Sequence, residues 1–460
     1  MALERLRSLA RMAASFIHSR WCLRFRSRAQ LEAWQRRQLQ RFLREVMPRA
    51  PRFRDLAGTP LEQLPYMDKQ VLMEQFAACN TRGIELQPAL EVALRAEQSR
   101  DFAPLLGEFT VGLSSGTSGH RGVFLVSAEE RERWAGTLLA HTLPRALLRH
   151  LLPWQAPLRI AFFLRANSRL YTTLASRRID FAFHDLLLGV DAALPTLECQ
   201  QPDVLVAPAT VLRGLAEAKL AGRLRIAPRH LVSVAEVLEP ADADLIEQAF
   251  GRRPAQIYQA SEGFLGYSCE QGNLHLNESH LHIEAEWLDA EQRRFQPVIT
   301  DFSRTTQTIV RYRLNDVLRL APQPCPCGRA ERTIEAIEGR ADEVLWLPAL
   351  DGGELRPLYP DLVRRALTTA AAEIREWSIR QQGMTWQLGL LADDPERQRT
   401  AIEQALSNLF QQHGVRPAQL QFGPWQAAET GAKRRRLLLE QRPQEPVCTS
   451  PVCTAPACTS

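Results

Sequence analysis

A loop rich in glycine and hydroxyl side chains is the first stretch of this sequence whose residue types could do chemistry. The nine residues Ser114–Gly122 contain three glycines and four serine or threonine hydroxyls, and strand-like runs, Phe109–Val111 and Gly122–Val126, flank them. Glycine lets a backbone approach a ligand closely, and backbone N–H groups with small hydroxyls can surround phosphate oxygens. A polar turn in a β-hairpin would have the same composition, so the loop alone leaves both interpretations open.

Four later stretches add groups that a site for nucleotide chemistry would use. Tyr258 can stack on a base, and Glu262, four residues later, can hold Mg²⁺ beside phosphates. Asp316 follows a strand-like segment and can accept hydrogen bonds from both hydroxyls of a ribose. Gly339 stands among charged residues, which suits a hinge, and Lys433 closes the series.

Each of these residues also has an ordinary structural interpretation. Tyr258 could belong to the core, Asp316 could accept hydrogen bonds in a turn, and Lys433 could be part of a solvated run of charges. Their joint order and spacing are more specific than any one of them. No Gly-Lys-Ser/Thr follows the glycines, so a Walker-type phosphate loop is excluded.

The segments after the glycine-rich loop alternate between strand-like and helix-like patterns, and this alternation indicates the fold that would position these groups. The expected strands are Leu158–Leu164, Val204–Ala207, His230–Val234 and Ala255–Tyr258, and the expected helices are Ala128–Leu139, Thr210–Ala221 and Ala241–Phe250. Such a pattern predicts an α/β fold with a mainly parallel, doubly wound sheet. By contrast, Cys269–Gln296 is polar and rich in turn residues, and Ile309–Leu320 resumes strand character.

The pattern changes after Gly339 and Arg340, and the length of 460 residues also favours more than one domain. Shorter strands and helices then predict a separate, small α+β domain: strands at Val344–Leu347, Ile374–Arg380 and Trp386–Leu391, and helices at Leu358–Ala370 and Pro395–Gln412. We therefore expect an N-terminal helical segment (1–50), a large ligand-binding domain (51–340), a small mobile domain that carries Lys433 (341–437) and a disordered, low-complexity tail (438–460).

Charge and composition bound the broad class of protein. The chain has 57 basic and 52 acidic residues and only three lysines, Lys69, Lys219 and Lys433. Its arginines are interleaved with glutamates instead of forming one stripe, so we favour a bias toward arginine and expect no nucleic-acid partner. No segment approaches the about 18 apolar residues of a membrane span, and no secretion signal is recognisable. With nine cysteines expected to be reduced, we expect a cytoplasmic protein.

The first 48 residues are expected to be helical. Leu6, Leu9, Ala13 and Phe16 recur at helical spacing with arginines among them. A basic amphipathic helix of this kind can lie on an anionic membrane. We favour the alternative, a helix that packs on the body of the protein or on a partner chain.

Together, the motifs resemble those of the acyl-adenylate-forming superfamily, which includes acyl-CoA synthetases, nonribosomal adenylation domains and luciferases. Within it, the chain resembles the branch of phenylacetate-CoA ligases and capsule-biosynthesis proteins. The family's phosphate loop, its Tyr-Gly-x-Thr-Glu and Tyr-Arg-x-Gly-Asp motifs and its Gly-Arg-x-Asp-Asp hinge appear here as Ser114–Gly119, Tyr258–Glu262, Tyr312–Asp316 and Gly339–Glu343. The resemblance covers roughly Leu31–Arg436 and leaves the tail uncovered.

The resemblance implies a role for each of these residues. Lys433, Glu262 and Thr117 would be catalytic, with Lys433 bridging the substrate carboxylate and the α-phosphate and Glu262 binding Mg²⁺. Asp342 would be the hinge on which the small domain turns between two half-reactions. The expected ATP-binding residues are Ser114, Ser115, Gly116, Thr117, Ser118, Gly119, Ala235, Glu236, Tyr258, Ser261, Asp316 and Arg340.

The sequence departs from the family pattern at a few positions. Gln259 and Asn315 replace glycines, and His120-Arg121 replaces Pro-Lys after the phosphate loop. Ala432 stands where the family has its lysine, and Lys433 follows one position later. If this shift keeps Lys433 from the site, adenylation would be slow or the acceptor step altered.

Cys269, His275, Cys325 and Cys327 form a candidate zinc site. Thiolates and an imidazole suit a tetrahedral structural zinc ion, and a set placed in this way resembles a metal clip of the phenylacetate-CoA ligase branch. The spacing is not a standard Cys-x2-Cys, so four reduced residues near a turn are the alternative. His280 or His282 could take the place of His275.

The resemblance implies an enzyme that uses MgATP to convert a carboxylic acid to acyl-AMP with release of pyrophosphate, and then transfers the acyl group to coenzyme A. An aromatic or otherwise apolar acid is expected because the resembling branch activates arylacetates. One alternative is an adenylating enzyme that passes its acyl group to an amine, hydroxyl or carrier protein, or that adenylylates a cofactor. Another is a non-catalytic, zinc-stabilised binding protein. A homodimer is an expectation from the family alone.

Overall fold

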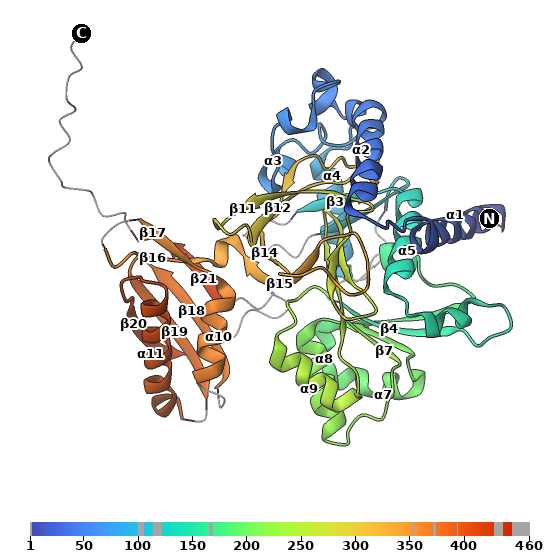
Figure 1. Cartoon of the computed structure of the whole chain (residues 1–460). Coiled ribbons are helices and arrows are strands. Elements are labelled where there is room, and N and C mark those ends of the chain that lie inside the picture. The colour runs from blue at the N-terminus through green and yellow to red at the C-terminus, as the bar shows by residue number, and fades with distance from the viewer. Residues whose placement is uncertain are drawn as a thin grey trace, which may run out of the picture. The chain divides into compact units, whose positions relative to one another are not determined.

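The computed structural model describes residues 2–99, 105–113, 122–164, 169–351, 354–370, 374–392, 394–426 and 436–443 (Figure 1). Within these ranges the chain forms two compact units that divide between Ile337 and Glu338. Each unit contains its own cluster of buried apolar side chains, as the expected pair of a large α/β domain and a small α+β domain requires. None of the described helices combines the length and the apolar character that crossing a bilayer requires.

The first unit contains most of the helices and one large sheet. Its α-helices are α1 (Ala2–Ile17), α2 (Arg28–Glu45), α3 (Lys69–Glu74), α4 (Leu86–Ser99), α5 (Ala128–Thr142), α6 (Arg169–Thr172), α7 (Val190–Gln200), α8 (Ala209–Leu220) and α9 (Pro240–Phe250). Shorter helical turns are η1 (His18–Cys22), η2 (Met47–Arg49), η3 (Pro51–Leu56), η4 (Leu61–Gln63), η5 (Arg145–Leu151) and η6 (Leu186–Leu188).

Half of the large sheet is parallel, as the alternating pattern predicts. Its strands β4 (Leu158–Leu164), β5 (Ile179–Asp185), β6 (Val204–Ala207), β7 (His230–Ser233) and β8 (Ala255–Ala260) pair in the order β5-β4-β6-β7-β8. Successive side chains of a strand point to opposite faces. On β4, Ile160 and Phe162 therefore pack with α5, whereas Ala161 and Phe163 pack with the layer of α7, α8 and α9 (Figure 1). Burial on both faces explains why these strands read as continuous apolar runs.

The other half of the sheet is antiparallel and was largely missed by the sequence pattern. It contains β9 (Gly263–Ser268), β10 (Leu274–Leu276), β11 (His282–Trp287), β12 (Arg294–Thr300), β13 (Tyr312–Arg313), β14 (Asp316–Leu320) and β15 (Thr333–Arg340). The segment Cys269–Gln296, expected to form turns, includes β10, β11 and the start of β12. These strands are short or expose one face, and β11 fully buries only Ile283, so their apolar signal is weak.

A separate three-stranded sheet holds the glycine-rich loop. It consists of β1 (Leu105–Leu106), β2 (Phe109–Leu113) and β3 (Val123–Val126) in the order β1-β2-β3. The antiparallel register pairs Leu113 with Val123, so β2 and β3 form the expected hairpin and the two ends of the loop lie next to each other. Val111, Val123 and Leu125 pack against α4 in a core of their own.

The second unit has the α+β composition that the sequence predicts. Its strands are β16 (Leu345–Pro348), β17 (Leu355–Leu358), β18 (Ile374–Gln382), β19 (Thr385–Ala392), β20 (Gln419–Pro424) and β21 (Leu437–Gln441), and its α-helices are α10 (Pro360–Ala370) and α11 (Pro395–Gln412). Four strands form a sheet in the order β20-β19-β18-β21, and β16 and β17 form a hairpin. Trp386, fully buried on β19, meets Phe410 of α11 edge to face, which fixes the helix on the sheet.

Candidate active site

Two parts of the expected active site fall outside the described residues. These are the phosphate loop, with Ser114, Ser115, Gly116, Thr117, Ser118 and Gly119, and Lys433. The hairpin ends that carry the loop are described, as are the residues expected at the base, the ribose and the magnesium ion. The structure therefore shows how the fold positions those residues.

The residue expected to stack on the base contacts the residue expected to bind the ribose. Tyr258 lies on β8 and Asp316 begins β14. The Tyr258 hydroxyl donates a hydrogen bond of 2.6 Å to Asp316 Oδ2, although the two residues are 58 positions apart in the chain. A hydrogen bond to an ionised oxygen is among the stronger ones in proteins, so it fixes the direction of the carboxylate.

The expected magnesium ligand is held in a similar way. Glu262 lies just after β8, where its Oε1 accepts a hydrogen bond of 2.8 Å from the Tyr312 hydroxyl and its Oε2 accepts one of 3.0 Å from the Ser261 hydroxyl. Tyr312 is 50 positions further along the chain. Two hydroxyls therefore fix both oxygens of a half-buried carboxylate, and tyrosines of the two motifs hold both carboxylates.

The residues expected beside the adenine follow the carboxyl end of a parallel strand. β7 ends at Ser233, whose buried hydroxyl has no hydrogen-bond partner among the described residues. Ala235 adopts φ = +65°, a conformation that non-glycine residues rarely take and that clusters at functional sites. Glu236 accepts hydrogen bonds from the Thr210 backbone N–H and hydroxyl at 3.0 and 2.9 Å. Ligands of open α/β sheets bind at this edge.

A segment that sequence reasoning missed, residues 304–307, fastens these parts together. Arg304 donates to the Ser261 carbonyl at 2.8 Å, beside Glu262. Gln307 accepts a hydrogen bond of 3.2 Å from the Leu125 backbone on β3, in the hairpin that carries the glycine-rich loop. The loop strands and the Glu262 motif are therefore tied to one stretch of chain.

Glu130 is the buried anchor of that segment. One of its oxygens accepts from the Thr305 and Thr306 backbone N–H groups at 2.5 and 2.8 Å, and the other accepts from the Thr306 hydroxyl at 2.6 Å. Burial acts to raise the pKa of Glu130, but hydrogen bonds from Thr306, Ser127 and Thr305 outweigh burial and lower it. The spacing Ser127-x-x-Glu130, a capping box at the start of α5, is the sequence signal that could have found this residue.

The expected hinge residues form a compact turn at the start of the second unit. Arg340 ends β15, and its guanidinium donates to Asp342 at 3.1 Å. Gly339 adopts φ = +130°, and a Cβ atom there would lie 2.7 Å from a Glu343 carboxylate oxygen, so the position requires glycine. Glu343 in turn pairs with Arg364 of α10 at 3.2 Å. The Arg340–Asp342 pair and the glycine therefore define the conformation of this turn.

The cysteines and the histidine of the candidate zinc site converge. Their four ligand atoms lie within 4.8 Å of one another, with three of the four residues buried. Cys269 Sγ and Cys325 Sγ are 3.7 Å apart, and Cys327 Sγ and His275 Nε2 are 3.4 Å apart. Two thiolates on one tetrahedral zinc would be about 3.8 Å apart, and a thiolate and an imidazole about 3.6 Å apart, given the usual bond lengths. The residues therefore fit a zinc ion.

The surroundings of the cluster orient His275 as a metal ligand. Its Nδ1 lies 3.1 Å from the Glu331 carbonyl, which leaves Nε2 directed at the cysteines. A backbone carbonyl on the second ring nitrogen is the usual partner of a metal-bound histidine. The alternatives His280 and His282 are not in the cluster, and His280 instead contacts Asn277 and Ser279. The structure thus corrects that alternative and groups His275 with the cysteines.

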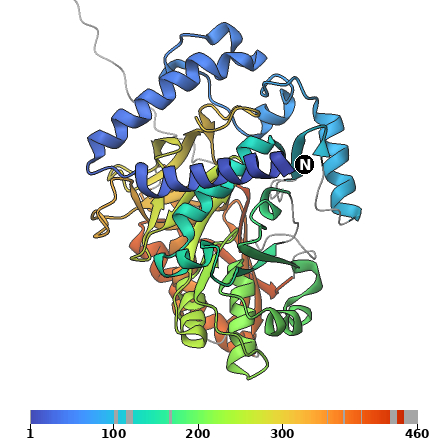
Figure 2. The same cartoon turned by 90° about the vertical axis from the view of Figure 1, so that its right-hand side faces the viewer.

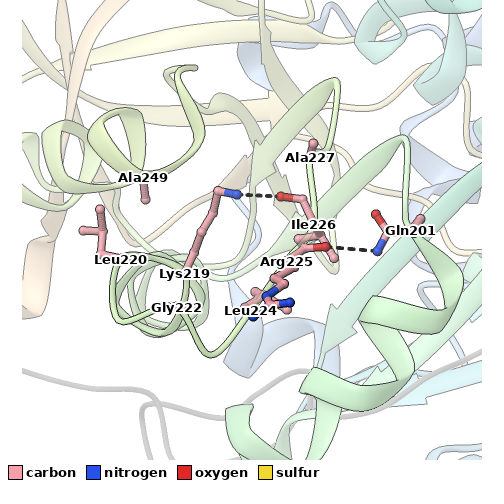
Figure 3. Close-up of a pocket in the computed structure, with 9 residues that line it drawn as sticks. All are labelled: Gln201, Lys219, Leu220, Gly222, Leu224, Arg225, Ile226, Ala227 and Ala249. Atoms are coloured by element: carbon pink, nitrogen blue, oxygen red, sulfur yellow. Dashed lines mark hydrogen bonds between the residues drawn. The ribbon is translucent and has the colours of Figure 1, made fainter.

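A cavity of about 590 Å³ lies elsewhere on the first unit, between the C-terminal ends of α8 and α9 (Figure 3). There Lys219 donates to the Ile226 carbonyl at 2.8 Å, and Gln201 donates to the Arg225 carbonyl at 3.0 Å. The lysine and amide groups are thus used to close the loop after α8. None of the residues that line it belongs to the expected site.

Solved structures of known enzymes resemble this fold, although no protein-family model and no curated protein matches the sequence. A 2-hydroxyisobutyryl-CoA ligase in the postadenylation state, in complex with 2-HIB-AMP, gives a TM-score of 0.60 at 19% identity and covers 89% of each chain. An open conformation of 2-hydroxyisobutyryl-CoA ligase, with 2-HIB-AMP and CoA, gives 0.55 at 18% identity over 88% of this chain and 90% of that one.

The amide bond synthetase McbA from Marinactinospora thermotolerans is a third similar structure. Its TM-score is 0.50 at 14% identity, over 73% of this chain and 67% of that one. At such low identities the similarity concerns the fold, which agrees with the arrangement of a large and a small unit expected from the motifs. The chain therefore has the fold of the adenylate-forming ligases.

Proposed function

We propose that this protein is an adenylate-forming ligase, which activates a carboxylic acid with ATP to give acyl-AMP and pyrophosphate. The observation that carries this proposal is the pair of hydrogen bonds from Tyr258 to Asp316 and from Tyr312 to Glu262. They bring two motifs together on a fold of this class. The residues that they join are 58 and 50 positions apart in the chain, and a generic α/β domain has no reason to keep these separations. The acid that we propose is aromatic or otherwise apolar, as the resemblance implies.

The described residues fit the parts of MgATP that the resemblance assigns to them. Asp316 would accept hydrogen bonds from the ribose, and Tyr258 would cover the adenine from β8. Mg²⁺ prefers one or two carboxylates with phosphate and water oxygens, and Glu262 offers one carboxylate already oriented by two hydroxyls. When bound, the ion would offset the repulsion between the substrate carboxylate and the α-phosphate.

The groups expected to position the reactants come from different parts of the chain. The hydroxyls and amides of Ser114–Gly119 would hold the phosphates, and Lys433 would neutralise the attacking carboxylate. Most of the acceleration in such a reaction comes from positioning and electrostatic stabilisation. A turn about Asp342 would then remove Lys433 and admit the acceptor.

We propose coenzyme A as the acceptor of the acyl group. The similar open conformation of 2-hydroxyisobutyryl-CoA ligase is in complex with 2-HIB-AMP and CoA, which supports this choice. An amine is the second candidate, because another similar structure is that of an amide bond synthetase. Purified protein supplied with an acid, MgATP and either CoA or an amine should release AMP faster with the true acceptor.

Acid-dependent exchange of pyrophosphate into ATP is the test of the first step. Wild-type protein should show exchange with at least one member of a panel of aryl and aliphatic acids. Glu262→Gln should abolish most of it, whereas Glu286→Gln, which removes a half-buried carboxylate paired with Arg313, should leave it intact. Absence of exchange with the whole panel would leave a binding protein as the better description.

We further propose that Cys269, His275, Cys325 and Cys327 hold a structural zinc ion. The match between the observed interatomic separations and those of tetrahedral zinc supports this assignment. The cluster joins the turn after β9, the strand β10 and the loop between β14 and β15. An ion there would cross-link the antiparallel half of the sheet, from which Tyr312 and Asp316 also come.

A further inference from the structure

The helix α1 turns several of its large apolar side chains to solvent. Leu6, Leu9 and Ile17 of this helix, and Trp21 in the following turn η1, are between 46% and 64% exposed. The alanines on the same stretch, Ala10, Ala13 and Ala14, are exposed as well. A helix on the surface of a globular protein usually buries its large apolar side chains, whereas these lie on the solvent side of α1.

The opposite face of α1 combines small polar residues with the partly buried Met12 and Phe16, and it fixes the helix on α5. The Ser15 hydroxyl donates to the Arg133 carbonyl at 2.8 Å, and the Ser15 and Ser19 hydroxyls lie 3.1 and 3.2 Å from that of Thr137. A Cβ atom on Gly136 would lie 2.3 Å from the Met12 carbonyl oxygen, so the two helix backbones touch. Packing of this kind holds α1 against the first unit, along its surface (Figure 2), with the apolar face outward.

Exposed arginines lie on α1 and in the segment that follows it. Arg7, Arg24 and Arg26 are exposed, and Glu4 is the only acidic residue of α1. The arginines nearer to α5 are engaged there, since Arg11 pairs with Glu132 and Arg20 donates to the Ala140 and Leu143 carbonyls. The side of the helix that faces solvent is therefore apolar, with Arg7 on α1 and Arg24 and Arg26 exposed in the segment after η1.

We propose that this face, formed by Leu6, Leu9, Ile17 and Trp21 with Arg7 and Arg24, docks on an anionic lipid surface. An interfacial helix lies in the membrane plane, with its apolar side chains below the headgroups and its basic residues among the phosphates. Tryptophan is favoured at the same depth, and Phe16 holds Trp21 by an edge-to-face contact with centroids 5.6 Å apart. The helix would bind from the surface without spanning the bilayer.

The charges favour a lipid surface over a second copy of this chain. Two copies that met through this face would bring their exposed arginines together, and α1 offers only Glu4 to offset them. Like charges placed opposite each other oppose association, whereas anionic headgroups attract them. The contact with α5 occupies the face that carries Ser15 and Phe16, so it leaves Leu6, Leu9 and Ile17 on the solvent side.

Sedimentation of the full chain with lipid vesicles tests this docking. Wild-type protein should sediment with vesicles of phosphatidylcholine and phosphatidylglycerol, and about tenfold less with phosphatidylcholine alone. Leu6→Gln/Leu9→Gln/Ile17→Gln/Trp21→Gln should abolish sedimentation. Arg7→Gln/Arg24→Gln should weaken it about tenfold and reduce its sensitivity to salt.

Matched variants away from α1 provide the control. Leu188→Gln/Leu220→Gln/Leu391→Gln removes three comparably exposed apolar side chains, and Arg36→Gln/Arg37→Gln removes two exposed arginines of α2. Both should sediment like the wild type, and thermal unfolding should show that every variant is folded. The proposal is overturned if wild-type protein ignores anionic vesicles, or if control and α1 variants bind equally. It is likewise overturned if the α1 variants only convert a dimer to a monomer.

Discussion

The cysteine–histidine cluster and the proposed nucleotide site lie in the same unit, but the fold arranges their side chains differently. In the cluster, four ligand atoms converge on one point and lie within 4.8 Å of one another. In the nucleotide site, the two carboxylates are each bonded to a tyrosine hydroxyl, Tyr258 on Asp316 and Tyr312 on Glu262. The four ligand atoms of the cluster surround one point, whereas each carboxylate is held by a tyrosine of the other motif.

Under the proposed function, the cluster would stabilise the fold and the carboxylates would take part in the reaction. A metal ion in a buried, complete ligand set contributes to the free energy of unfolding. Carboxylates that already have hydroxyl partners can exchange them for a nucleotide at small net cost, because one hydrogen bond replaces another. Variants of the first region should therefore lose stability, and variants of the second should lose activity.

The largest expected effect is loss of the metal. Cys325→Ser/Cys327→Ser should contain no zinc by elemental analysis, whereas wild-type protein should contain about one ion per chain. Its free energy of unfolding should fall by several kcal/mol, on the order of 5 or more, because two ligands are lost from a buried site. Chemical denaturation and calorimetry measure this loss.

The exposed Cys199 provides a matched control for that experiment. Cys199→Ser removes a thiol on α7 and should change neither the zinc content nor the stability. Equal zinc in the wild type and in the double variant would mean that the four residues are simply reduced side chains near a turn.

The next largest effect concerns activity without stability. Glu262→Gln should reduce acid-dependent pyrophosphate exchange by about 10²–10³-fold, as expected for loss of a group that stabilises charge in the transition state. Its unfolding temperature should stay near that of the wild type, since one of the two hydroxyls of Ser261 and Tyr312 can donate to the amide oxygen and the other can accept from the amide NH2 group. A variant that kept full exchange would remove Glu262 from the catalytic residues, and one that unfolded would break the contrast between the two regions.

Glu130 should affect stability less than the cluster does, because it is one buried carboxylate that anchors residues 304–307. Glu130→Gln would leave backbone donors of Thr305 and Thr306 without their anionic acceptor and should cost about 3 kcal/mol at neutral pH. Glu129→Gln, at the neighbouring exposed position, should cost less than about 0.5 kcal/mol.

The pH dependence sharpens the assignment to Glu130. Its pKa in the folded protein is lowered, so its contribution to stability is complete above the ordinary value of 4.5 and is lost as the pH falls through the lower folded-state value. The difference in unfolding free energy between wild type and Glu130→Gln should therefore be constant near neutral pH and should shrink below that value. A difference that grew in acid would contradict the assignment.

The sequence predicted the parallel strands well, because a strand that is buried on both faces leaves a local pattern. Val204–Ala207 is a continuous apolar run, since both faces of its strand are buried. The contact between Tyr258 and Asp316 could not be predicted in the same way. It depends on the order of strands between β8 and β14, which includes β9, β10 and β15, and those antiparallel strands leave a weak signal.

The orientation of α1 shows the same limit. The spacing of Leu6, Leu9 and Phe16 predicts an amphipathic helix, and the expectation that it packs on the body is confirmed by its contact with α5. The pattern does not reveal which face packs. Gly136 and Thr137 on α5 accept the face that carries Ser15 and Phe16, and this close backbone approach leaves Leu6 and Leu9 on the solvent side.

The smallest predicted effect tests the hydroxyl–carboxylate pairs themselves. Tyr258→Phe keeps the ring and removes the hydroxyl that directs Asp316, so the KM for ATP should rise by up to about tenfold, close to the worth of one hydrogen bond, with kcat little changed. Tyr267→Phe, which removes a buried hydroxyl that accepts from Arg329 beside the metal cluster, should leave the KM for ATP unchanged. If Tyr258→Phe lowered the KM instead, the hydroxyl would be a competitor of the ribose, and the pair would hold Asp316 back from the nucleotide. A change of the KM for ATP in either direction would tie this hydrogen bond to nucleotide binding. An unchanged KM with a loss of stability would instead make the hydrogen bond a structural contact, like those of the cysteine–histidine cluster.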